Sequence, residues 1–237
     1  MENQFERTEL LIGKEAVEKL HNSRVCVFGL GGVGSFVCEA LVRAGIKDFI
    51  IIDNDTVDIT NLNRQIIATR KTINKYKVDV MEERMKEINP EINIIKIKEF
   101  ISKDSKLEFI DNSIDYIIDA IDTVSAKIEL VMKANELNIP IISAMGTGNK
   151  LNPTELEVTD ISKTEMCPLA KVIRKELRNR GIKHLKVVYS KEKPIETIEN
   201  KINKENNKKV PGSISFVPSV AGLIIASEVV KDIIDKI

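Results

Sequence analysis

The feature that most constrains the fold is VCVFGLGGVGSFVCEALVRAG, residues 25–45. A β-branched apolar run leads into glycines at G-x-G-x-x-G spacing, and a helical pattern follows. In such a turn the first glycine permits a sharp bend, the second lets the backbone approach a phosphate, and the third lets the helix pack closely on the strand. Phosphate oxygens then face the N–H groups at the positive end of the helix. The stretch predicts a nucleotide-binding turn at Gly29, Gly31, Gly32 and Gly34.

The first 145 residues alternate apolar runs with helical patterns, which is typical of βαβ units in a parallel sheet. We therefore expect an α/β fold, with a Rossmann-like, mostly parallel sheet and helices on both faces. The expected strands are 24–29, 48–53, 92–98, 115–120 and 139–144. The expected helices are 34–44, 73–88, 104–111 and 125–137, with Gly45 and Pro90 as stop signals.

After residue 149 the pattern changes and predicts a C-terminal antiparallel and helical extension. Strands are expected at 154–161 and 184–190, and helices at 167–181 and 219–235. Residues 191–212 are rich in Lys, Glu and Asn and poor in apolar residues, which predicts a mobile loop. A chain of 237 residues can bury one substantial core. We expect a single domain, with 1–148 as its nucleotide-binding part and 149–237 as its substrate-facing part.

Net charge neither favours nor excludes a nucleic-acid partner, because 36 basic and 36 acidic residues cancel. The distribution is uneven, since residues 163–209 hold fourteen Lys or Arg against six Asp or Glu. This excess fits a polyanionic partner, and it also fits a solvated helix face followed by a lysine-rich loop.

The sequence carries no pattern typical of a targeting signal, and its longest apolar segment is shorter than the ~20 residues that span a bilayer. Its three cysteines are too few and too scattered for a disulfide framework or a four-thiolate zinc site. Cys26 and Cys38 fall inside a strand and a helix, where burial is expected. These features predict a cytoplasmic protein without a membrane span.

Charged residues follow the strands at positions that suit a nucleotide. Asp53, at the end of the second strand, suits a ribose hydroxyl. A nicotinamide dehydrogenase would share that carboxylate, whereas ATP adenylation must also stabilise a pyrophosphate leaving group with cations and usually a metal. Arg64, Lys77 and Asp122 are expected at the carboxyl ends of the strands, in one crevice. The open alternatives are surface charges, and for Asp122 a cap on the helix near Ser125.

Four motifs, GLGGVGS, DNDTVDITNLNRQ, YKVDVMEERMKEINP and IDAIDTVSAK, resemble adenylating enzymes of the ThiF/MoeB type, which are related to ubiquitin-activating enzymes. The resemblance covers residues 5–148. It implies ATP and Mg²⁺ as cofactors and a homodimer as the assembly. By position, it implies the following roles: Asp53 on the ribose, Asp55 in the nucleotide site, Asn61, Arg64 and Lys77 on the phosphates, Asp122 on Mg²⁺, and Arg7 on the triphosphate of the partner subunit.

The second half of the chain narrows the resemblance. Sulfur-carrier activators typically have two zinc-binding C-x-x-C pairs, and this sequence has none. CPLAKVIRKELRNRGI, VVYSKEKP and VPGSISFVPSVAGLIIASEVV instead resemble the tRNA threonylcarbamoyladenosine dehydratases. That branch implies that ATP activates the carboxylate of a threonylcarbamoyl group on a tRNA adenosine, and that a ring then closes with loss of water. Activation is needed because a carboxylate cannot expel hydroxide at neutral pH.

With tRNA as the implied partner, the basic helix expected at 167–181 is predicted to bind tRNA. The residues expected at tRNA phosphates are Lys171, Arg174, Lys175, Arg178 and Arg180. Cys167, just before Pro168, is either a thioester-forming nucleophile activated by the helix dipole or a small buried residue at a helix boundary. Direct cyclisation favours the second, since it needs no thioester.

Two other functions stay open at this point. The chain could activate a small ubiquitin-like or sulfur-carrier protein, or it could be an ATP-binding scaffold. Whether a sulfur-transfer protein assists the enzyme as a further partner also stays open. Arg64, Lys77 and Asp122 argue against a scaffold, because a site that only binds has little need of charge that stabilises pyrophosphate.

Overall fold

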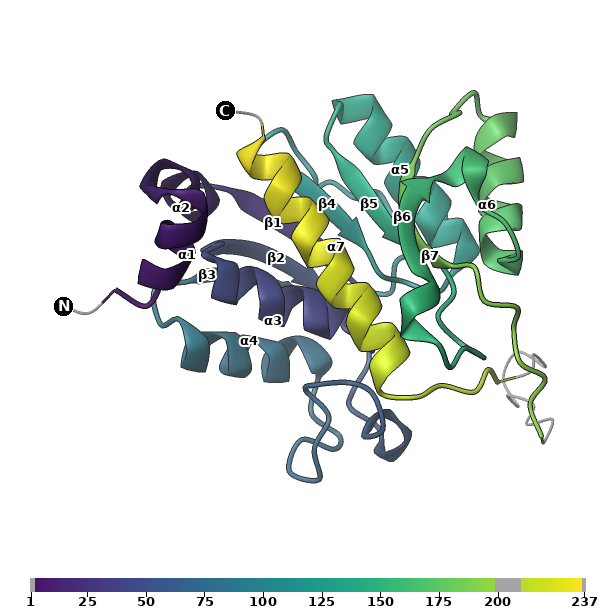
Figure 1. Ribbon diagram of the computed structural model, residues 1–237, viewed down its shortest axis with the longest axis horizontal. Helices are drawn as coiled ribbons and strands as arrows, with labels where there is room; N and C mark the ends of the chain where they lie inside the picture. Colours follow the sequence, from purple (N-terminus) through teal and green to yellow (C-terminus); the bar gives the residue numbers. More distant parts are fainter. Residues whose placement is uncertain (1–2, 199–209, 236–237) are drawn as a thin grey trace.

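The computed structural model describes residues 3–198 and 210–235 and contains one seven-stranded sheet (Figure 1). The strands are β1 (Arg24–Phe28), β2 (Asp48–Ile52), β3 (Asn93–Ile97), β4 (Tyr116–Asp119), β5 (Ile141–Ala144), β6 (Leu156–Asp160) and β7 (Lys186–Ser190). Their order in the sheet is β3-β2-β1-β4-β5-β7-β6, and each pairing is parallel except β6 with β7. The mostly parallel, Rossmann-like sheet is therefore confirmed.

Helices cover both faces of this sheet. In Figure 1, α7 (Phe216–Ile234) crosses the front face, where it packs on α3 (Gly34–Ala44). The remaining α-helices are α1 (Glu6–Ile12), α2 (Lys14–His21), α4 (Lys77–Ile88), α5 (Val124–Leu137) and α6 (Pro168–Asn179). The short 3-10 helices are η1 (Ile59–Asn61), η2 (Pro153–Glu155) and η3 (Ile161–Lys163).

The central strands are apolar on both sides because both of their faces are buried. Along β1, Val25 and Val27 belong to the core shared with α3 and α7, whereas Cys26 and Phe28 belong to the core shared with α5. This alternation follows from the period of two in a strand. A third apolar cluster joins α5 to α6 beside β7.

The glycine turn after β1 rests directly on the turn after β4. Gly29 has φ +85°, and a Cβ on it would lie 2.8 Å from the carbonyl oxygen of Ala120. A Cβ on Gly34 would overlap the carbonyl oxygen of Gly29. The chain can make this contact only with hydrogen at both positions, so the two turns are brought together by backbone packing.

Several boundaries differ from the sequence-based expectation. Helix α4 begins at Lys77 rather than at 73, because Asn74 is left-handed at φ +67°. Helix α7 begins at Phe216 rather than at 219, which places Pro218 in its first turn, where proline is tolerated. The short helices α1 and α2 were not expected.

The helix expected at 104–111 is wrong. Residues 101–113 form turns, with Leu107 at φ +53° and with the side chains of Ser102 and Asp111 accepting hydrogen bonds from the backbone two residues ahead. Such local bonds compete with a helix. Leu107 and Ile110 are nevertheless buried in the core.

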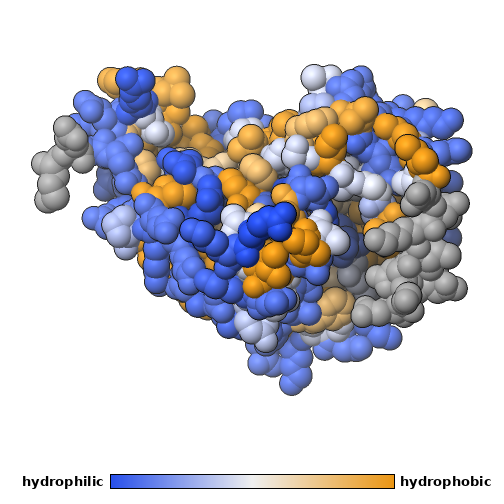
Figure 2. Space-filling model, turned by 90° about the horizontal axis from the view of Figure 1, so that it is seen from below, coloured by the Kyte–Doolittle hydropathy of each residue, from blue (hydrophilic) through white to orange (hydrophobic). Residues whose placement is uncertain are grey.

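The expected loop is only partly described. Residues 191–198 and 210–212 contain no helix or strand, and 199–209 lie outside the described residues. Within the described part of the chain, no helix is both long enough and apolar enough to cross a membrane. The face in Figure 2 is mainly hydrophilic, with apolar residues in separate groups.

A buried ion pair lies under the β4–α5 connection. Lys127 on α5 is fully buried, and its Nζ donates to Asp119 Oδ2 at 3.0 Å and to the Ala144 carbonyl at 2.8 Å. The Ser143 hydroxyl also donates to Asp119, whose Oδ1 accepts from the Ile121 N–H at 3.2 Å. These bonds join β4, β5 and α5, and they orient the loop that follows Asp119.

Replacing this lysine should therefore be costly. Lys127→Met leaves Asp119 buried without its counter-charge, and we expect the free energy of unfolding to fall by about 3–5 kcal/mol. Urea denaturation monitored by circular dichroism measures the change. Lys133→Met is the matched control on the same helix, because Lys133 pairs only with the exposed Glu136. Its effect should stay below about 1 kcal/mol. Equal effects of the two substitutions would contradict the role given to the buried pair.

Candidate active site

A pocket of about 570 Å³ opens at the carboxyl ends of the strands. It lies where the chain order reverses between β1 and β4, which is the position at which open α/β sheets bind ligands. Its lining gathers most of the residues that the sequence assigned to a nucleotide site: Gly29, Gly31, Gly32, Asp53, Asp55, Asn61, Arg64, Lys77 and Asp122. Gly34 does not line the pocket and instead packs behind the turn.

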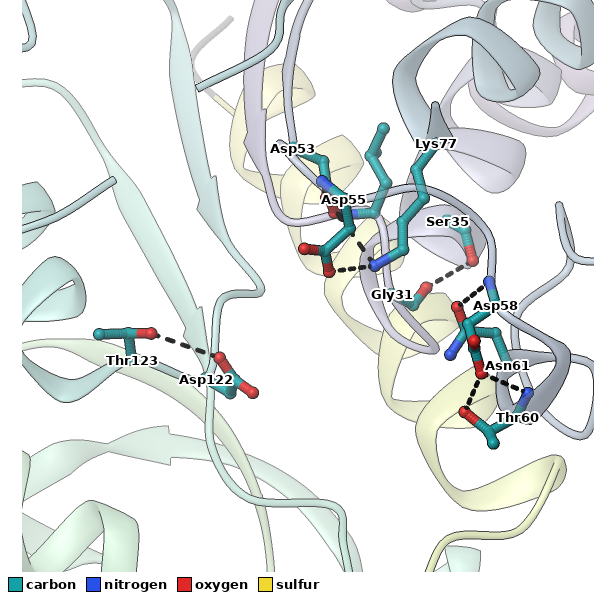
Figure 3. Close-up of polar contacts among 11 residues, drawn as sticks. Gly31, Ser35, Asp53, Asp55, Asp58, Thr60, Asn61, Lys77, Asp122 and Thr123 are labelled. Carbon is teal, nitrogen blue, oxygen red and sulfur yellow. Dashed lines mark hydrogen bonds and ion pairs between the residues drawn. The ribbon is translucent and has the colours of Figure 1, made fainter. Parts of the chain in front are cut away.

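Two aspartates and a lysine form the first wall of this pocket (Figure 3). Lys77 Nζ lies 2.6 Å from Asp55 Oδ2 and 3.8 Å from Asp53 Oδ1. Asp53 accepts backbone hydrogen bonds from Leu30 at 2.7 Å and from Asp55 at 2.8 Å. Burial raises the pKa of the Asp53 carboxyl, while Lys77 and the two N–H donors act in the opposite direction. Asp53 thus ties β2 to the glycine turn at the place expected for a ribose.

The segment after β2 carries Asn61 and Arg64. Asp58 and Asn61 form a reciprocal cap, with Asn61 Oδ1 accepting from the Asp58 N–H at 3.0 Å. Since its oxygen is engaged, the amide nitrogen of Asn61 is the end that can serve a ligand. Arg64 Nη1 donates to the Thr60 carbonyl at 3.0 Å and to Asn63 Oδ1 at 2.8 Å. One edge of the guanidinium is anchored, and its other N–H groups are left to bind phosphate.

Asp122 stands on the opposite side of the opening from Lys77 and Asn61 (Figure 3). Its carboxylate is exposed and accepts only a long hydrogen bond, 3.5 Å, from the Thr123 hydroxyl. The N-cap of α5 is Thr123, so Asp122 does not cap that helix. In the described ranges no three His, Cys, Asp or Glu side chains cluster in a way that could hold a metal. A Mg²⁺ at Asp122 would therefore take further oxygen ligands from nucleotide phosphates and water, as Mg²⁺ commonly does.

The other predicted residues lie outside this pocket. Arg7 is exposed on α1 and does not line the pocket of its own chain. On α6, Lys171, Lys175 and Arg178 are exposed on one face, following i, i+4, i+7 spacing. Two arginines have intramolecular partners: Arg174 donates to Thr164 at 2.7 and 2.8 Å, and Arg180 pairs with Glu176 at 2.8 Å.

The cysteines are all buried. Cys26 and Cys38 are fully buried as expected, and burial raises the pKa of both thiols. Cys167 is the N-cap of α6, where its Sγ accepts from the Ala170 N–H at 3.5 Å, and it is only 5% exposed. This geometry favours the structural role over the nucleophilic one.

The comparisons with known proteins agree with this geometry. Residues 5–236 match the ThiF family. The chain belongs to this family. It is 46% identical over 247 aligned residues to the tRNA threonylcarbamoyladenosine dehydratase of Bacillus subtilis, covering 100% of this chain and 97% of that protein.

Solved structures of the family show the same fold. The E. coli tRNA N6-threonylcarbamoyladenosine dehydratase, TcdA, in complex with AMP superposes with a TM-score of 0.89 at 32% identity, covering 98% of this chain and 94% of that one. Its complex with ATP gives 0.88, with the same identity and coverage. The family resemblance inferred from the motifs is therefore confirmed.

Part of the lining of this ThiF-family site was not expected from the sequence. Gln65 lies beside Gly31 and belongs to the motif DNDTVDITNLNRQ, but no role was predicted for it. Pro211, Gly212, Ser213 and Pro218 also line the pocket. Nothing in the sequence signals their presence there, because they are about 180 residues from the glycine turn and sit in or beside the expected loop.

Arg64→Ala and Asp122→Ala should weaken ATP binding without unfolding the protein. Arg64 supplies charge-assisted hydrogen bonds worth about 1.5–3 kcal/mol, so its loss should reduce affinity roughly tenfold or more. Asp122→Ala should abolish the difference between ATP affinities measured with and without Mg²⁺. Isothermal titration calorimetry checks both.

The free energy of unfolding should change by about 1 kcal/mol or less in either variant, because neither side chain has a buried partner. Arg70→Ala is the control, since Arg70 is exposed and outside the pocket lining. ATP affinity equal to that of the control would contradict the assigned roles.

Proposed function

We propose that this chain is an ATP-dependent tRNA threonylcarbamoyladenosine dehydratase. The observation that carries the proposal is the pocket itself, in which a glycine turn, Arg64 and Lys77 lie around the same opening as the exposed carboxylate of Asp122. The full-length similarity to a protein of that name supports the choice of substrate.

The reaction divides into two steps. In the first, an oxygen of the threonylcarbamoyl carboxylate attacks the α-phosphorus of ATP, and the bond to pyrophosphate breaks, which leaves an acyl-adenylate. In the second, a nearby nitrogen attacks the acyl carbon, AMP departs with the former carboxylate oxygen, and the nitrogen loses its proton. Because the nucleophile is already attached to the substrate, orientation alone contributes several kcal/mol, up to ~7 or more in ideal cases.

The nucleotide-site residues predicted from the sequence each have a role in forming the acyl-adenylate. The N–H groups of the glycine turn and the positive end of α3 receive phosphate oxygens. Asp53 accepts from a ribose hydroxyl. Arg64 and Lys77 neutralise charge on the departing pyrophosphate, and Asn61 donates a hydrogen bond to it from the amide nitrogen. Asp122 would hold Mg²⁺, which would supply additional positive charge to the phosphates.

The proposed assembly is a homodimer in which Arg7 reaches the triphosphate of the other subunit. Arg7 lies outside the pocket of its own chain. Leu10 and Leu11 on the same helix are 84% and 83% exposed, which gives α1 an apolar surface for a second copy to cover.

The proposed tRNA surface is the basic face of α6. Leu169 in the first turn of this helix lines the pocket, so α6 leads away from the site of chemistry. Lys171, Lys175 and Arg178 can contact backbone phosphates without reading sequence. A reaction on tRNA that consumes ATP fits the cytoplasm.

The test is to incubate the protein with ATP, Mg²⁺ and threonylcarbamoyl-modified tRNA, and to analyse the nucleosides by mass spectrometry. The modified adenosine should lose one water, about 18 daltons, as the activated carboxylate is attacked within the same nucleoside. The Asp122→Ala protein should give no product. Pyrophosphate exchange that depends on a small carrier protein, with no change in the nucleoside, would favour a carrier activator. ATP binding with no product and no exchange would favour a scaffold.

Combined replacement of Lys175 and Arg178 by alanine should weaken tRNA binding and flatten its salt dependence. Each lost phosphate contact lowers the slope of log affinity against log salt by roughly 0.7–0.9. Fluorescence anisotropy over a range of KCl concentrations measures that slope. Lys86→Ala with Lys231→Ala is the matched control, because these exposed lysines belong to α4 and α7. An unchanged slope in the α6 variant would remove the proposed role of this helix.

A further inference from the structure

A segment far along the chain from the glycine turn crosses the pocket. Residues 210–215 form neither helix nor strand, and Pro211, Gly212 and Ser213 belong to the pocket lining. We call residues 210–215 the strap. It runs between the phosphate-binding loop that contains Arg64 and the turn that follows β5.

Asn63 ties one end of the strap to the arginine beside it. The Asn63 Nδ2 donates to the Ser213 carbonyl at 3.0 Å, and the Asn63 Oδ1 accepts from Arg64 Nη1 at 2.8 Å. Both ends of this amide are therefore used, one on the strap and one on the guanidinium. Movement of the strap and orientation of Arg64 are linked through one side chain.

Asn149 holds the strap from the other side. Its backbone N–H donates to the Gly212 carbonyl at 2.8 Å, and its Oδ1 accepts from the Gly212 N–H at 2.7 Å. Its carbonyl also accepts from the Ile195 N–H at 2.8 Å, so both ends of the 195–212 segment meet at one residue. Asn149 adopts φ +58°, a conformation that Asn tolerates better than most residues.

Close packing also holds the strap against the rest of the pocket. A Cβ on Gly148 would lie 2.9 Å from the Cβ of Pro211, and one on Gly32 would lie 3.1 Å from the Cβ of Pro218. The strap and the start of α7 therefore press against the two glycine-containing edges of the pocket. Together they form part of the pocket wall.

We propose that Asn63 and Asn149 are positioning residues, which hold the strap across the pocket so that water does not reach the acyl-adenylate before the ring closes. The inference rests on the proposed function. Two nucleophiles compete for the same acyl carbon. Attack by the substrate nitrogen gives the ring and AMP. Attack by water breaks the same carbon–oxygen bond, restores the carboxylate and releases AMP, so that one ATP is consumed without product.

The ratio of AMP released to cyclised nucleoside formed measures how well the strap keeps water from the acyl-adenylate. Asn149→Gly keeps the positive φ and the backbone bonds but removes the side-chain bond to Gly212. We expect the ratio to rise about threefold or more, with a smaller loss of ATP affinity than Asn63→Ala causes, because Asn149 is connected to Arg64 only through the strap and Asn63. Asn63→Ala should raise the ratio and also weaken ATP binding, since Arg64 loses one of its two anchors and keeps only the Thr60 carbonyl.

A matched control is Asn138→Gly. Asn138 has φ +56° at the C-cap of α5 and lies outside this pocket, so the ratio should stay at its wild-type value. Wild-type ratios in folded Asn149→Gly and Asn63→Ala proteins would overturn the proposal.

Hydrogen exchange separates failure of this inference from failure of the proposed function. If the wild-type protein forms no cyclised nucleoside, the proposed function fails, and with it the competition between ring closure and hydrolysis. The assignment of the strap is then decided by peptides that cover residues 210–215. These should exchange faster in Asn149→Gly than in wild type, whereas equal exchange would overturn the assignment.

Discussion

The backbone contact between the turn after β1 and the turn after β4 is the constraint on which the site depends. Gly29 meets the Ala120 carbonyl, and Gly34 meets the carbonyl of Gly29, at distances that leave no room for a side chain. This contact brings the N–H groups of the glycine turn and the carboxylate of Asp122 to one opening. The buried Lys127–Asp119 pair holds the second turn from below, so a charge pair in the core and a glycine contact beside the pocket support the same geometry.

The polar residues of the pocket are arranged so that a nucleotide can replace the present partner of Lys77 at a small cost in free energy. Lys77 is buried and pairs closely with Asp55, whose side chain is 59% exposed. When phosphate approaches Lys77, Asp55 can return to water without remaining in a dry environment as an unpaired charge. Asp53 differs because it is buried and receives two backbone N–H groups, and those bonds keep its carboxylate in place. The two aspartates thus differ in mobility: Asp53 is fixed at the place proposed for the ribose, and Asp55 is an exchangeable partner of Lys77.

Acyl activation followed by intramolecular attack requires two opposing properties of such a pocket. The leaving group must be stabilised by charge, which attracts water, while the acyl carbon must be kept from water. In this chain the charged side chains come from the first half, and the wall formed by the strap comes from the second half. Asn63 connects them, since it touches both Arg64 and the strap. The C-terminal part therefore does more than extend the sheet by two strands.

Most of the nucleotide-binding half could be predicted from its own residues. The period of the apolar pattern, the glycine spacing and the stop signals at Gly45 and Pro90 are local, and they placed β1, α3 and β2 to within a residue or two. The helix expected at 104–111 failed because buried Leu107 and Ile110 were compatible with helical spacing, whereas side-chain bonds to the backbone favoured turns. The signal for Lys127 was equally ambiguous, since a lysine in an amphipathic pattern is usually solvated.

What the sequence by itself determined was the type of fold, the family and most of the polar residues that line the pocket, because each depends on short-range patterns and motifs. Only the tertiary structure decided which distant segments share a wall with them. Lys127 reaches Asp119 and Ala144 because parallel strands β4 and β5 lie side by side under α5. The strap reaches Asn63 across 150 positions. Contacts of that separation follow from how the layers pack, and no local pattern encodes them.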